Sequence, residues 1–300
     1  MSGTKKKMVV TGTEGQVARS LLERARSIED LDLVALGRPR LDLADLSSIA
    51  KSLISEKPDV IVSAAAYTSV DKAEEDSEAA FKVNGHAPGE IARVAADLNI
   101  PLVHISTDYV FDGGKNEAYT EGDITAPAGV YGHSKLLGEQ TVREHTTNHV
   151  ILRTAWVYSP FGKNFLLTML RLAEGRDVIN VVDDQIGNPT CALALADGIL
   201  TVARNLISSD APELRGVFHA AGSGSASWAD FAAYIFETSR RYGGPFAEVQ
   251  RIPTSAYPTP ARRPANSRLD CAKLEAAHGV LLPFWKQCTE MIVRRLLVDR

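Results

Sequence analysis

Residues 8–18 read Met8-Val9-Val10-Thr11-Gly12-Thr13-Glu14-Gly15-Gln16-Val17-Ala18, and this stretch decides the fold of the chain. A short apolar run leads into a glycine turn, and an amphipathic segment follows, which predicts strand, turn and helix. The spacing G-x-x-G-x-x-A is typical of a dinucleotide-binding loop. Gly12 permits the tight turn, Gly15 lets the backbone approach a diphosphate, and the small Ala18 allows close helix–strand packing. The diphosphate would lie at the helix N-terminus, where free N–H groups favour an anion.

Four more apolar runs follow this first one, at residues 33–36, 60–62, 102–105 and 150–152. Each run is continuous rather than alternating with polar residues, which is typical of strands covered on both faces. Helical patterns lie between the runs, for example over residues 16–27 and 78–99. Strands that alternate with helices indicate βαβ units, so we expect an α/β fold with a doubly wound, Rossmann-type parallel sheet.

The pattern becomes less regular after Ser159, which predicts a second, smaller unit. Strands are expected at Val178–Val182 and residues 217–219, with a helix over residues 191–206 between them, and residues 257–264 form a proline-rich loop. We therefore expect a dinucleotide-binding domain over residues 1–157, to which residues 177–220 return. Residues 158–300 would form a mixed α/β C-terminal lobe that binds substrate.

Charge and composition exclude several classes of protein. The 33 Lys and Arg residues against 37 Asp and Glu give a formal net charge of −4, which argues against partners such as nucleic acid or a membrane surface. No stretch approaches the roughly 20 apolar residues of a spanning helix. The three cysteines lie far apart, and the apolar run near the start is too short for a signal peptide. The sequence therefore predicts a cytoplasmic protein.

The second predicted strand indicates which dinucleotide the fold binds. An acidic residue about 20 positions after the glycine loop often holds the adenosine ribose, and Asp32 has this spacing. Asp32, however, begins the strand, whereas ligands bind beyond the carboxyl end, which carries Gly37-Arg38-Pro39-Arg40. No carboxylate there repels a 2′-phosphate and Arg38 can bind one, so the sequence favours NADPH. The alternative is that Arg38 and Arg40 are solvated loop charges.

Three polar side chains are candidates for chemistry at the nicotinamide end. Tyr131 and Lys135 are four residues apart, so on a helix they share a face, and the ammonium would lower the pKa of the phenol. Such a phenol can give a proton to a carbonyl oxygen as hydride reaches its carbon. Thr107 follows the fourth strand and would hydrogen-bond that carbonyl. Taken singly, Tyr131 and Lys135 also fit a half-buried tyrosine and a surface lysine, and Thr107 and Asp108 fit a turn.

With these motifs in this order, the chain resembles the extended short-chain dehydrogenase/reductase superfamily and, more narrowly, the dTDP-4-dehydrorhamnose reductase family. The resemblance covers nearly the whole chain, and its last three segments are far more specific than a glycine loop. One mild departure is Ala18, where the family often has Gly. The segments are residues 11–17, 41–43, 65–71, 105–113 and 131–135, Arg153-Thr154-Ala155-Trp156-Val157-Tyr158, Asp184-Gln185-Ile186-Gly187-Asn188-Pro189-Thr190 and Arg263-Pro264-Ala265-Asn266-Ser267-Arg268-Leu269-Asp270.

The resemblance implies an enzyme that reduces the C4 keto group of dTDP-4-dehydro-L-rhamnose with NADPH, in the synthesis of rhamnose-containing polysaccharides. Thr107, Tyr131 and Lys135 would be the catalytic trio, and several relatives accept NADH as well. The cofactor residues implied are Gly12, Gly15, Gln16 and Val17 at the diphosphate, Asp42 and Leu43 at the adenine, Ala65, Ala66 and Tyr67 along the cleft, and Tyr131 and Lys135 at the nicotinamide.

The dTDP-sugar would contact Thr107, Asp108 and Trp156 by the same resemblance. The second lobe must supply donors for its diphosphate, and the candidates are Asn164 at the start of a helix and Arg263 in the proline-stiffened loop. The alternatives are that Trp156 is a core aromatic residue and that Arg263 only pairs with a carboxylate such as Asp270.

Two rival functions use the same fold. Nucleotide-sugar dehydratases that resemble this chain follow the catalytic Thr with Asp-Glu, whereas here Thr107-Asp108 precedes Tyr109, so the base that elimination needs is missing. Epimerases return the hydride to the same substrate. A non-catalytic regulatory subunit is the other rival, because the β subunit of methionine adenosyltransferase resembles this family. The seven histidines form no metal motif. Some relatives bind Mg²⁺ at a homodimer contact, to which the sequence assigns no residue here.

Overall fold

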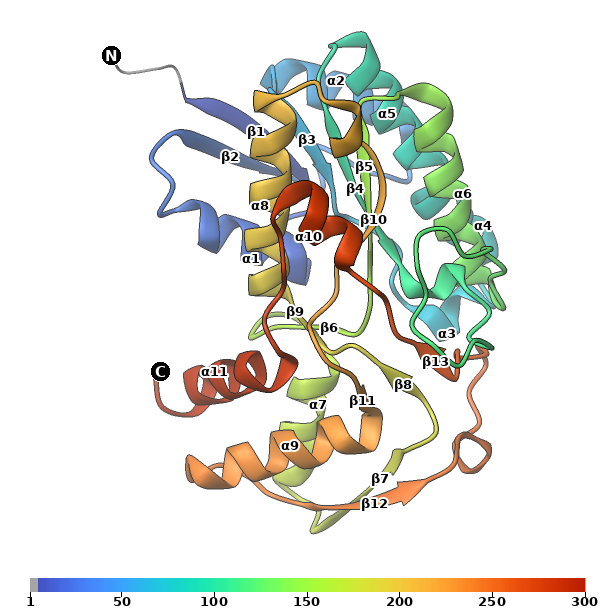
Figure 1. The fold of residues 1–300 in the computed structure, drawn as a ribbon, viewed down its shortest axis with the longest axis vertical. Helices are drawn as coiled ribbons and strands as arrows, with labels where there is room; N and C mark the ends of the chain where they lie inside the picture. Colours follow the sequence, from blue (N-terminus) through green and yellow to red (C-terminus); the bar gives the residue numbers. More distant parts are fainter. Residues whose placement is uncertain (1–4, 300) are drawn as a thin grey trace.

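Six parallel strands form the central sheet of the computed structural model, which describes residues 5–299 (Figure 1). The outer limits of the predicted domains, residues 1 and 300, lie outside the described residues. The strand order is β10-β5-β4-β3-β1-β2, and all neighbours are parallel, which confirms the predicted doubly wound sheet. The strands are β1 (Lys6–Thr11), β2 (Leu31–Leu36), β3 (Val60–Ser63), β4 (Leu102–Thr107), β5 (His149–Thr154) and β10 (Gly216–His219).

The strand order reverses at β1, which pairs with β2 on one side and with β3 on the other. Ligands of open α/β sheets bind beyond the carboxyl ends of the strands at such a reversal, because the loops there diverge and leave a crevice. The loops after β1, β3 and β4 are therefore the ones that can hold a ligand.

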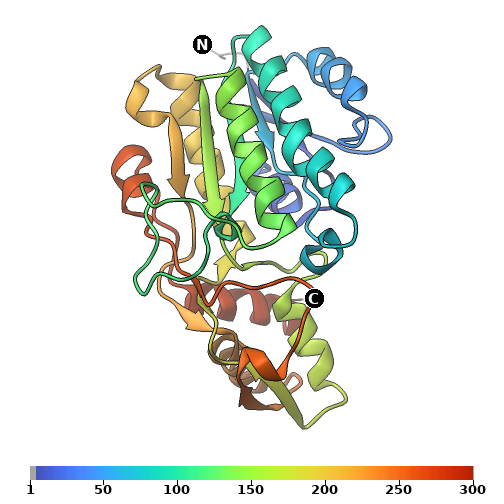
Figure 2. The same cartoon turned by 90° about the vertical axis from the view of Figure 1, so that its right-hand side faces the viewer.

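Helices cover both faces of the sheet, which explains the unbroken apolar runs. Met8 and Val10 of β1 enter the core on one face, beneath α1 and α8, while Val9 enters the core on the other face. Figure 2 shows α5 and α6 lying across that second face. The helices are α1 (Gln16–Ala25) and α8 (Ala192–Ser208) on the first face, and α2 (Leu46–Glu56), α5 (Ala87–Asp97) and α6 (Val130–His145) on the second.

The helix predicted over residues 78–99 is interrupted. The structure has α4 (Ser77–Phe81), a π-helical turn η1 (Lys82–His86) and then α5, with the short α3 (Val70–Ala73) before them. In the π-turn the Asn84 side chain hydrogen-bonds both the N–H and the carbonyl of Tyr67, at 2.8 and 3.0 Å, and Ser134 of α6 at 3.0 Å. These long-range bonds hold the segment after β3 against α6, beside the cleft.

The second lobe packs three helices around its own core, below the sheet in Figure 1. Its strands are short and pair in small sheets: β12 with β7, β6 with β9, and β8 with β11 and β13. The bounds of these elements are α7 (Phe165–Ala173), α9 (Trp228–Arg241), α11 (Trp285–Leu297), β6 (Val157–Tyr158), β7 (Val178–Val182), β8 (Ile186–Gly187), β9 (Thr190–Cys191), β11 (Ala226–Ser227), β12 (Glu248–Ile252) and β13 (Asn266–Ser267). The 3-10 turns are η2 (Asp108–Val110) after β4, η3 (Pro212–Leu214) before β10 and η4 (Thr254–Ala256) after β12.

The chain returns to the first lobe through α8 and β10, later than residue 177. Helix α8 packs on α1, and β10 pairs with β5, whereas β7 pairs with β12 in the second lobe. The prediction was wrong for β7 because an apolar run shows that a strand is buried and does not show which sheet it joins. Helix α10 (Ala272–His278) also packs on β10 and α8, a second return that the sequence did not predict.

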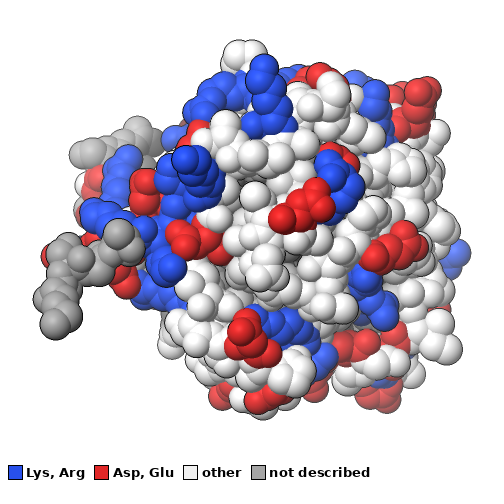
Figure 3. Space-filling view, turned by 90° about the horizontal axis from the view of Figure 1, so that it is seen from above, with Lys and Arg blue, Asp and Glu red and all other residues white. Residues whose placement is uncertain are grey.

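Charged side chains of both signs are interspersed on the end of the molecule seen in Figure 3, as the small net charge leads one to expect. Within residues 5–299, no helix has the length and the apolar composition needed to cross a membrane.

Candidate active site

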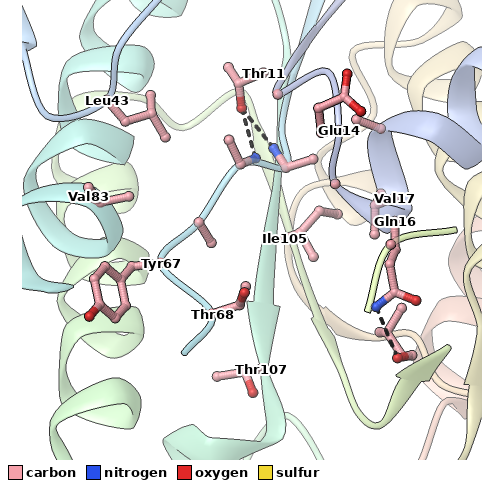
Figure 4. Close-up of a pocket in the computed structure, with 18 of the residues that line it drawn as sticks. Thr11, Glu14, Gln16, Val17, Leu43, Tyr67, Thr68, Val83, Ile105 and Thr107 are labelled. Atoms are coloured by element: carbon pink, nitrogen blue, oxygen red, sulfur yellow. Dashed lines mark hydrogen bonds between the residues drawn. The ribbon is translucent and has the colours of Figure 1, made fainter. Parts of the chain in front are cut away.

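A cleft of about 1090 Å³ lies at the carboxyl ends of β1, β3 and β4 and extends to the second lobe. Most of the residues predicted for cofactor, sugar and catalysis line it, from the glycine loop to Tyr131 and Trp156. Figure 4 shows its interior, with Leu43, Val83 and Tyr67 along one wall and Gln16, Val17 and Ile105 along the other. The cleft therefore joins regions of the chain far apart in sequence.

The glycine loop is shaped for a diphosphate. Gly12 has a φ of +93°, and a Cβ atom there would lie 3.3 Å from the Cβ of Ala65, so the turn packs tightly against the segment after β3. That segment is held by Thr11, whose Oγ1 accepts hydrogen bonds from the N–H groups of Ala64 and Ala65, both at 3.0 Å (Figure 4). Gly15 precedes α1 and no side chain caps the helix, so its first N–H groups are available to an anion.

The far end of the cleft can hold an adenosine. Leu41, Asp42 and Leu43 line it after β2, together with Arg38. Arg38 is exposed, and no ion pair to it occurs among the described residues, whereas Arg40 is paired with Glu56. Of the two arginines considered from the sequence, only Arg38 faces the cleft without a partner.

Tyr131, Lys135 and Thr107 come together at the opposite end of the cleft. Tyr131 and Lys135 lie on α6, one turn apart, and Thr107 is the last residue of β4. Lys135 is only 3% exposed, and its Nζ donates a hydrogen bond of 2.7 Å to the carbonyl of Ile105. The ring of Tyr109 packs edge-on against that of Tyr131, with centroids 5.5 Å apart. The phenol and the ammonium are thus fixed against the same strand end.

The pKa values at this end differ from the sequence-based expectation. Burial, together with the negative charge of Asp108, raises the pKa of Tyr131 to about 12, although a hydrogen bond with Thr107 acts in the opposite direction. Burial lowers the pKa of Lys135 to about 8, and the carboxylate of Glu139 opposes this. The spacing predicts that Lys135 lowers the pKa of Tyr131, whereas in the structure burial holds that pKa above its ordinary value.

Asp108 is a buried carboxyl beside the trio. Its Oδ1 accepts a hydrogen bond of 3.0 Å from the Thr107 hydroxyl. Burial raises the pKa of Asp108 to about 6, while hydrogen bonds with Ser267 and Thr107 act to lower it. The position suits a group that orients Thr107 and reaches a sugar hydroxyl.

A buried ion pair lies next to the carboxyl end of β4. Arg153 of β5 donates to both carboxylate oxygens of Glu139 on α6, at 2.9 and 2.7 Å, and both side chains are almost fully buried. Glu139 also accepts a hydrogen bond of 2.6 Å from Ser106, the neighbour of Thr107. Breaking a buried pair leaves an uncompensated charge, so this contact ties α6 to β4 and β5 firmly.

Trp156 faces the cleft in an unusual backbone conformation, with a φ of +48°. Its indole stacks on that of Trp228 from the second lobe, with ring centroids 3.5 Å apart and planes 8° from parallel. Gly187 also approaches it so closely that a Cβ would lie 2.5 Å from its Cε2. The Trp156 indole, which is predicted to contact the sugar, thus has one of its two faces covered by Trp228.

Two further predicted residues make contacts within the protein. Asn164 caps α7 through its Oδ1, and its Nδ2 donates to Gln16 at 3.0 Å. The Gln16 side chain is thereby joined to the second lobe. Arg263 pairs with Asp71 at 2.7 Å instead of Asp270, and it does not line the cleft, but its Nη1 is buried with no hydrogen-bond partner among residues 5–299.

The structure adds cleft residues that sequence reasoning missed, above all Trp228 and Lys163. The structure has a capping box at the start of α9, formed by Ser227-Trp228-Ala229-Asp230. Such a motif predicts where a helix begins, and it does not predict that Trp228, the first residue of the helix, faces a cleft. Lys163 lies in an irregular segment with no motif. As for metals, no group of three or more His, Cys, Asp or Glu side chains within residues 5–299 is arranged to hold an ion.

Comparison with known proteins gives one consistent result. Residues 6–298 match the family model described as the RmlD substrate binding domain. A curated dTDP-4-dehydrorhamnose reductase from Sinorhizobium fredii is 49% identical over 293 residues, which cover 98% of each chain. One from Escherichia coli K12 is 41% identical over 257 residues, 85% of each chain.

A similar solved structure is a dTDP-4-dehydrorhamnose reductase from Bacillus anthracis in complex with NADP. It has a TM-score of 0.89 and 33% sequence identity, and the match covers 96% of this chain and 99% of that one. A UDP-glucose 4-epimerase from Thermus thermophilus shares the fold at 19% identity with a TM-score of 0.79, and a putative epimerase from Burkholderia cenocepacia shares it at 17% with a TM-score of 0.77.

Proposed function

The chain belongs to the RmlD substrate binding domain family, and on that premise we propose that it reduces the C4 keto group of dTDP-4-dehydro-L-rhamnose with NADPH to give dTDP-L-rhamnose. The relatives that carry the name dTDP-4-dehydrorhamnose reductase, and the one solved with NADP, support the reaction and the cofactor. The supply of rhamnose for polysaccharides is part of the same proposal.

The cleft has residues suited to each part of the cofactor. The uncapped start of α1 and the Gly12 turn suit the diphosphate, Arg38, Asp42 and Leu43 suit the adenosine, and the segment 65–67 lies between them and the trio. When bound, NADPH supplies the hydride that reduces the carbonyl. The residues of the chain must then place the sugar's C4 carbonyl at the Tyr131 end and provide a proton there.

Tyr131 is the proton donor in this proposal. Its pKa of about 12 keeps the phenol protonated at neutral pH, so a proton is ready to move to the C4 oxygen as negative charge develops. Lys135 is close by and charged below its own pKa of about 8, and it stabilises the phenolate that forms. Thr107 orients the carbonyl, and Asp108 and Trp156 contact the sugar.

The observation that carries the proposal is the meeting of Tyr131, Lys135 and Thr107 at the end of a cleft whose other end is a diphosphate loop. A dehydratase would also need a carboxylate beside the trio that takes up a carbon-bound proton. The dehydratases that resemble this chain follow the Thr with an Asp-Glu pair, whereas Thr107-Asp108 is followed here by Tyr109, so that carboxylate is missing. Simple reduction needs no such base.

Coupled oxidation of NADPH tests the function directly. With dTDP-4-dehydro-L-rhamnose, we expect the absorbance of NADPH to fall with formation of one dTDP-L-rhamnose for each NADPH consumed. Without the keto-sugar, no NADPH should be lost. Binding of both ligands without turnover would instead support the non-catalytic rival.

The preference for NADPH over NADH should depend on Arg38. We expect Arg38→Ala to weaken NADPH binding by about 10-fold or more, since a charge-assisted contact to the 2′-phosphate contributes about 1.5–3 kcal/mol. NADH binding should hardly change. Dissociation constants for both cofactors, measured by fluorescence titration with Arg40→Ala as the control, check this. An unchanged preference would make Arg38 a solvated loop charge.

In the same proposal, Arg263 of the proline-rich loop at residues 257–264 binds the diphosphate of the nucleotide sugar with its guanidinium. Arg263→Ala should then raise KM for the dTDP-sugar several-fold while the NADPH dissociation constant stays constant. Asp71→Asn is the matched control, because it breaks the ion pair and keeps the guanidinium. If Arg263→Ala only lowers the melting temperature and leaves KM normal, the residue acts in holding the loop to the first lobe.

The location and assembly of the protein complete the proposal. All three cysteines are free, which supports work in a reducing cytoplasm. A homodimer is the assembly we propose, and sedimentation at several protein concentrations tests it. Addition of Mg²⁺ during the same runs shows whether the ion affects assembly.

A further inference from the structure

The segment at residues 159–164, between β6 and α7, fastens the second lobe to the diphosphate loop; we call it the strap. Gln16, the first residue of α1, accepts hydrogen bonds from the Ser159 hydroxyl at 2.8 Å and from the Asn164 amide at 3.0 Å. Its own amide donates to the carbonyl of Val157 at 3.3 Å (Figure 4). The two ends of the strap are therefore held by one side chain of the phosphate-binding helix.

A second contact holds the middle of the strap. Two guanidinium groups lie over the Phe161 ring. The Cζ of Arg19 of α1 is 4.5 Å from the ring centroid, and the Cζ of Arg295 of α11 is 5.3 Å from it. Arg295 in turn makes a bidentate ion pair with Glu23 of α1, at 2.6 and 2.8 Å. The strap is thus positioned by α1 on both sides of its turn.

The turn of the strap presents Lys163 to the cleft. Gly162 has a φ of +66°, and a Cβ there would lie 3.8 Å from the Cγ of Gln16, so the strap touches the first turn of α1. Lys163 follows and lines the cleft with Gly15 and Gln16. It is exposed, and no hydrogen bond or ion pair to it occurs within residues 5–299.

The Lys and Arg side chains that line the cleft lie at separate places along it. Arg38 lies at the adenosine end and Lys135 at the Tyr131 end, so Lys163 is the cation beside the glycine loop. The loop itself carries Glu14, whose carboxylate would repel an anion there. A dinucleotide diphosphate carries two negative charges, and the helix N-terminus offsets only part of them.

We propose that Lys163 binds the diphosphate of the dinucleotide cofactor and that the strap thereby couples the second lobe to cofactor binding. The inference rests on the proposed function only in taking NADPH as the cofactor. The other diphosphate that enters the cleft, that of the dTDP-sugar, is the alternative partner, and the contact of the strap with α1 favours the cofactor.

Titration of Lys163→Met with three ligands tests this. We expect the dissociation constant for NADPH to rise about 5- to 20-fold, as for loss of a charge-assisted contact at an exposed site. Adenosine 2′,5′-bisphosphate, which lacks the diphosphate, and dTDP should bind within about 2-fold of wild type. Lys163→Arg should restore most of the affinity. Lys51→Met, which removes an exposed lysine of α2 outside the cleft, is the control for net charge.

Two results overturn the inference. If Lys163→Met weakens dTDP and leaves NADPH unchanged, the lysine serves the substrate's diphosphate. If it weakens NADPH no more than Lys51→Met does, Lys163 is a solvated charge. Failure of the proposed function is a different result, because wild-type protein would then bind NADPH without reducing the keto-sugar or would not bind it at all.

Discussion

Tyr131→Phe should lose turnover by about 10²- to 10⁴-fold while the fold and the affinity for NADPH persist, because general acid catalysis contributes about this much. The phenol is the only part removed, and the ring keeps its edge-on contact with Tyr109. Steady-state rates with dTDP-4-dehydro-L-rhamnose, with NADPH affinity measured separately, check the expectation.

Tyr257→Phe is the matched control for this variant, since Tyr257 is exposed on a loop and does not line the cleft. Its rate should equal that of wild type. A near-normal rate in Tyr131→Phe would remove Tyr131 from its role and direct attention to Asp108, the other group beside Thr107 that can carry a proton.

Lys135→Met should lose activity and gain stability at the same time. The ammonium is buried, and its pKa falls from 10.5 to about 8, so keeping it charged in the folded state costs up to about 3 kcal/mol at neutral pH. Loss of the hydrogen bond to Ile105 costs about 1 kcal/mol, which leaves a net gain of up to about 2 kcal/mol in the free energy of unfolding. We expect kcat to fall by about 10²-fold or more, together with weaker NADPH binding.

The pH dependence of that gain separates a buried charge from other effects. Below pH 8 both the folded and the unfolded chain hold the proton, so wild type bears the full cost there. Between pH 8 and 10.5 the unfolded chain binds more protons, and the stability of wild type rises with pH relative to the variant. Denaturant titrations at about pH 7 and about pH 10 should therefore give a gain that shrinks at the higher pH. A gain that is constant with pH, or a loss of stability, would contradict a desolvated ammonium.

The central sheet could be predicted from the sequence because its strands are buried on both faces, and continuous apolar runs such as Val60–Ser63 have no other ready explanation. The second lobe could not be predicted to the same depth. Five of its strands are two residues long, too short for any periodicity, and β7 carries no sign of the partner it pairs with.

The site shows the same division. Gly12, Tyr131 and Lys135 lie in motifs whose chemistry can be interpreted locally, whereas Trp228 and Lys163 reach the cleft only because two lobes pack together. Their positions depend on contacts across long sequence separations, such as the bond between Gln16 and Asn164. Electrostatics was the least predictable part, because the spacing of Tyr131 and Lys135 does not show how far desolvation shifts their pKa values.

Transfer of deuterium from NADPH labelled at C4 of the nicotinamide tests the account most directly. If the protein reduces the C4 carbonyl with Tyr131 as the proton donor, the purified dTDP-sugar should carry one deuterium at C4, and wild type should form it at least about 10²-fold faster than Tyr131→Phe. An unlabelled sugar, with the labelled NADPH unconsumed, would contradict the account.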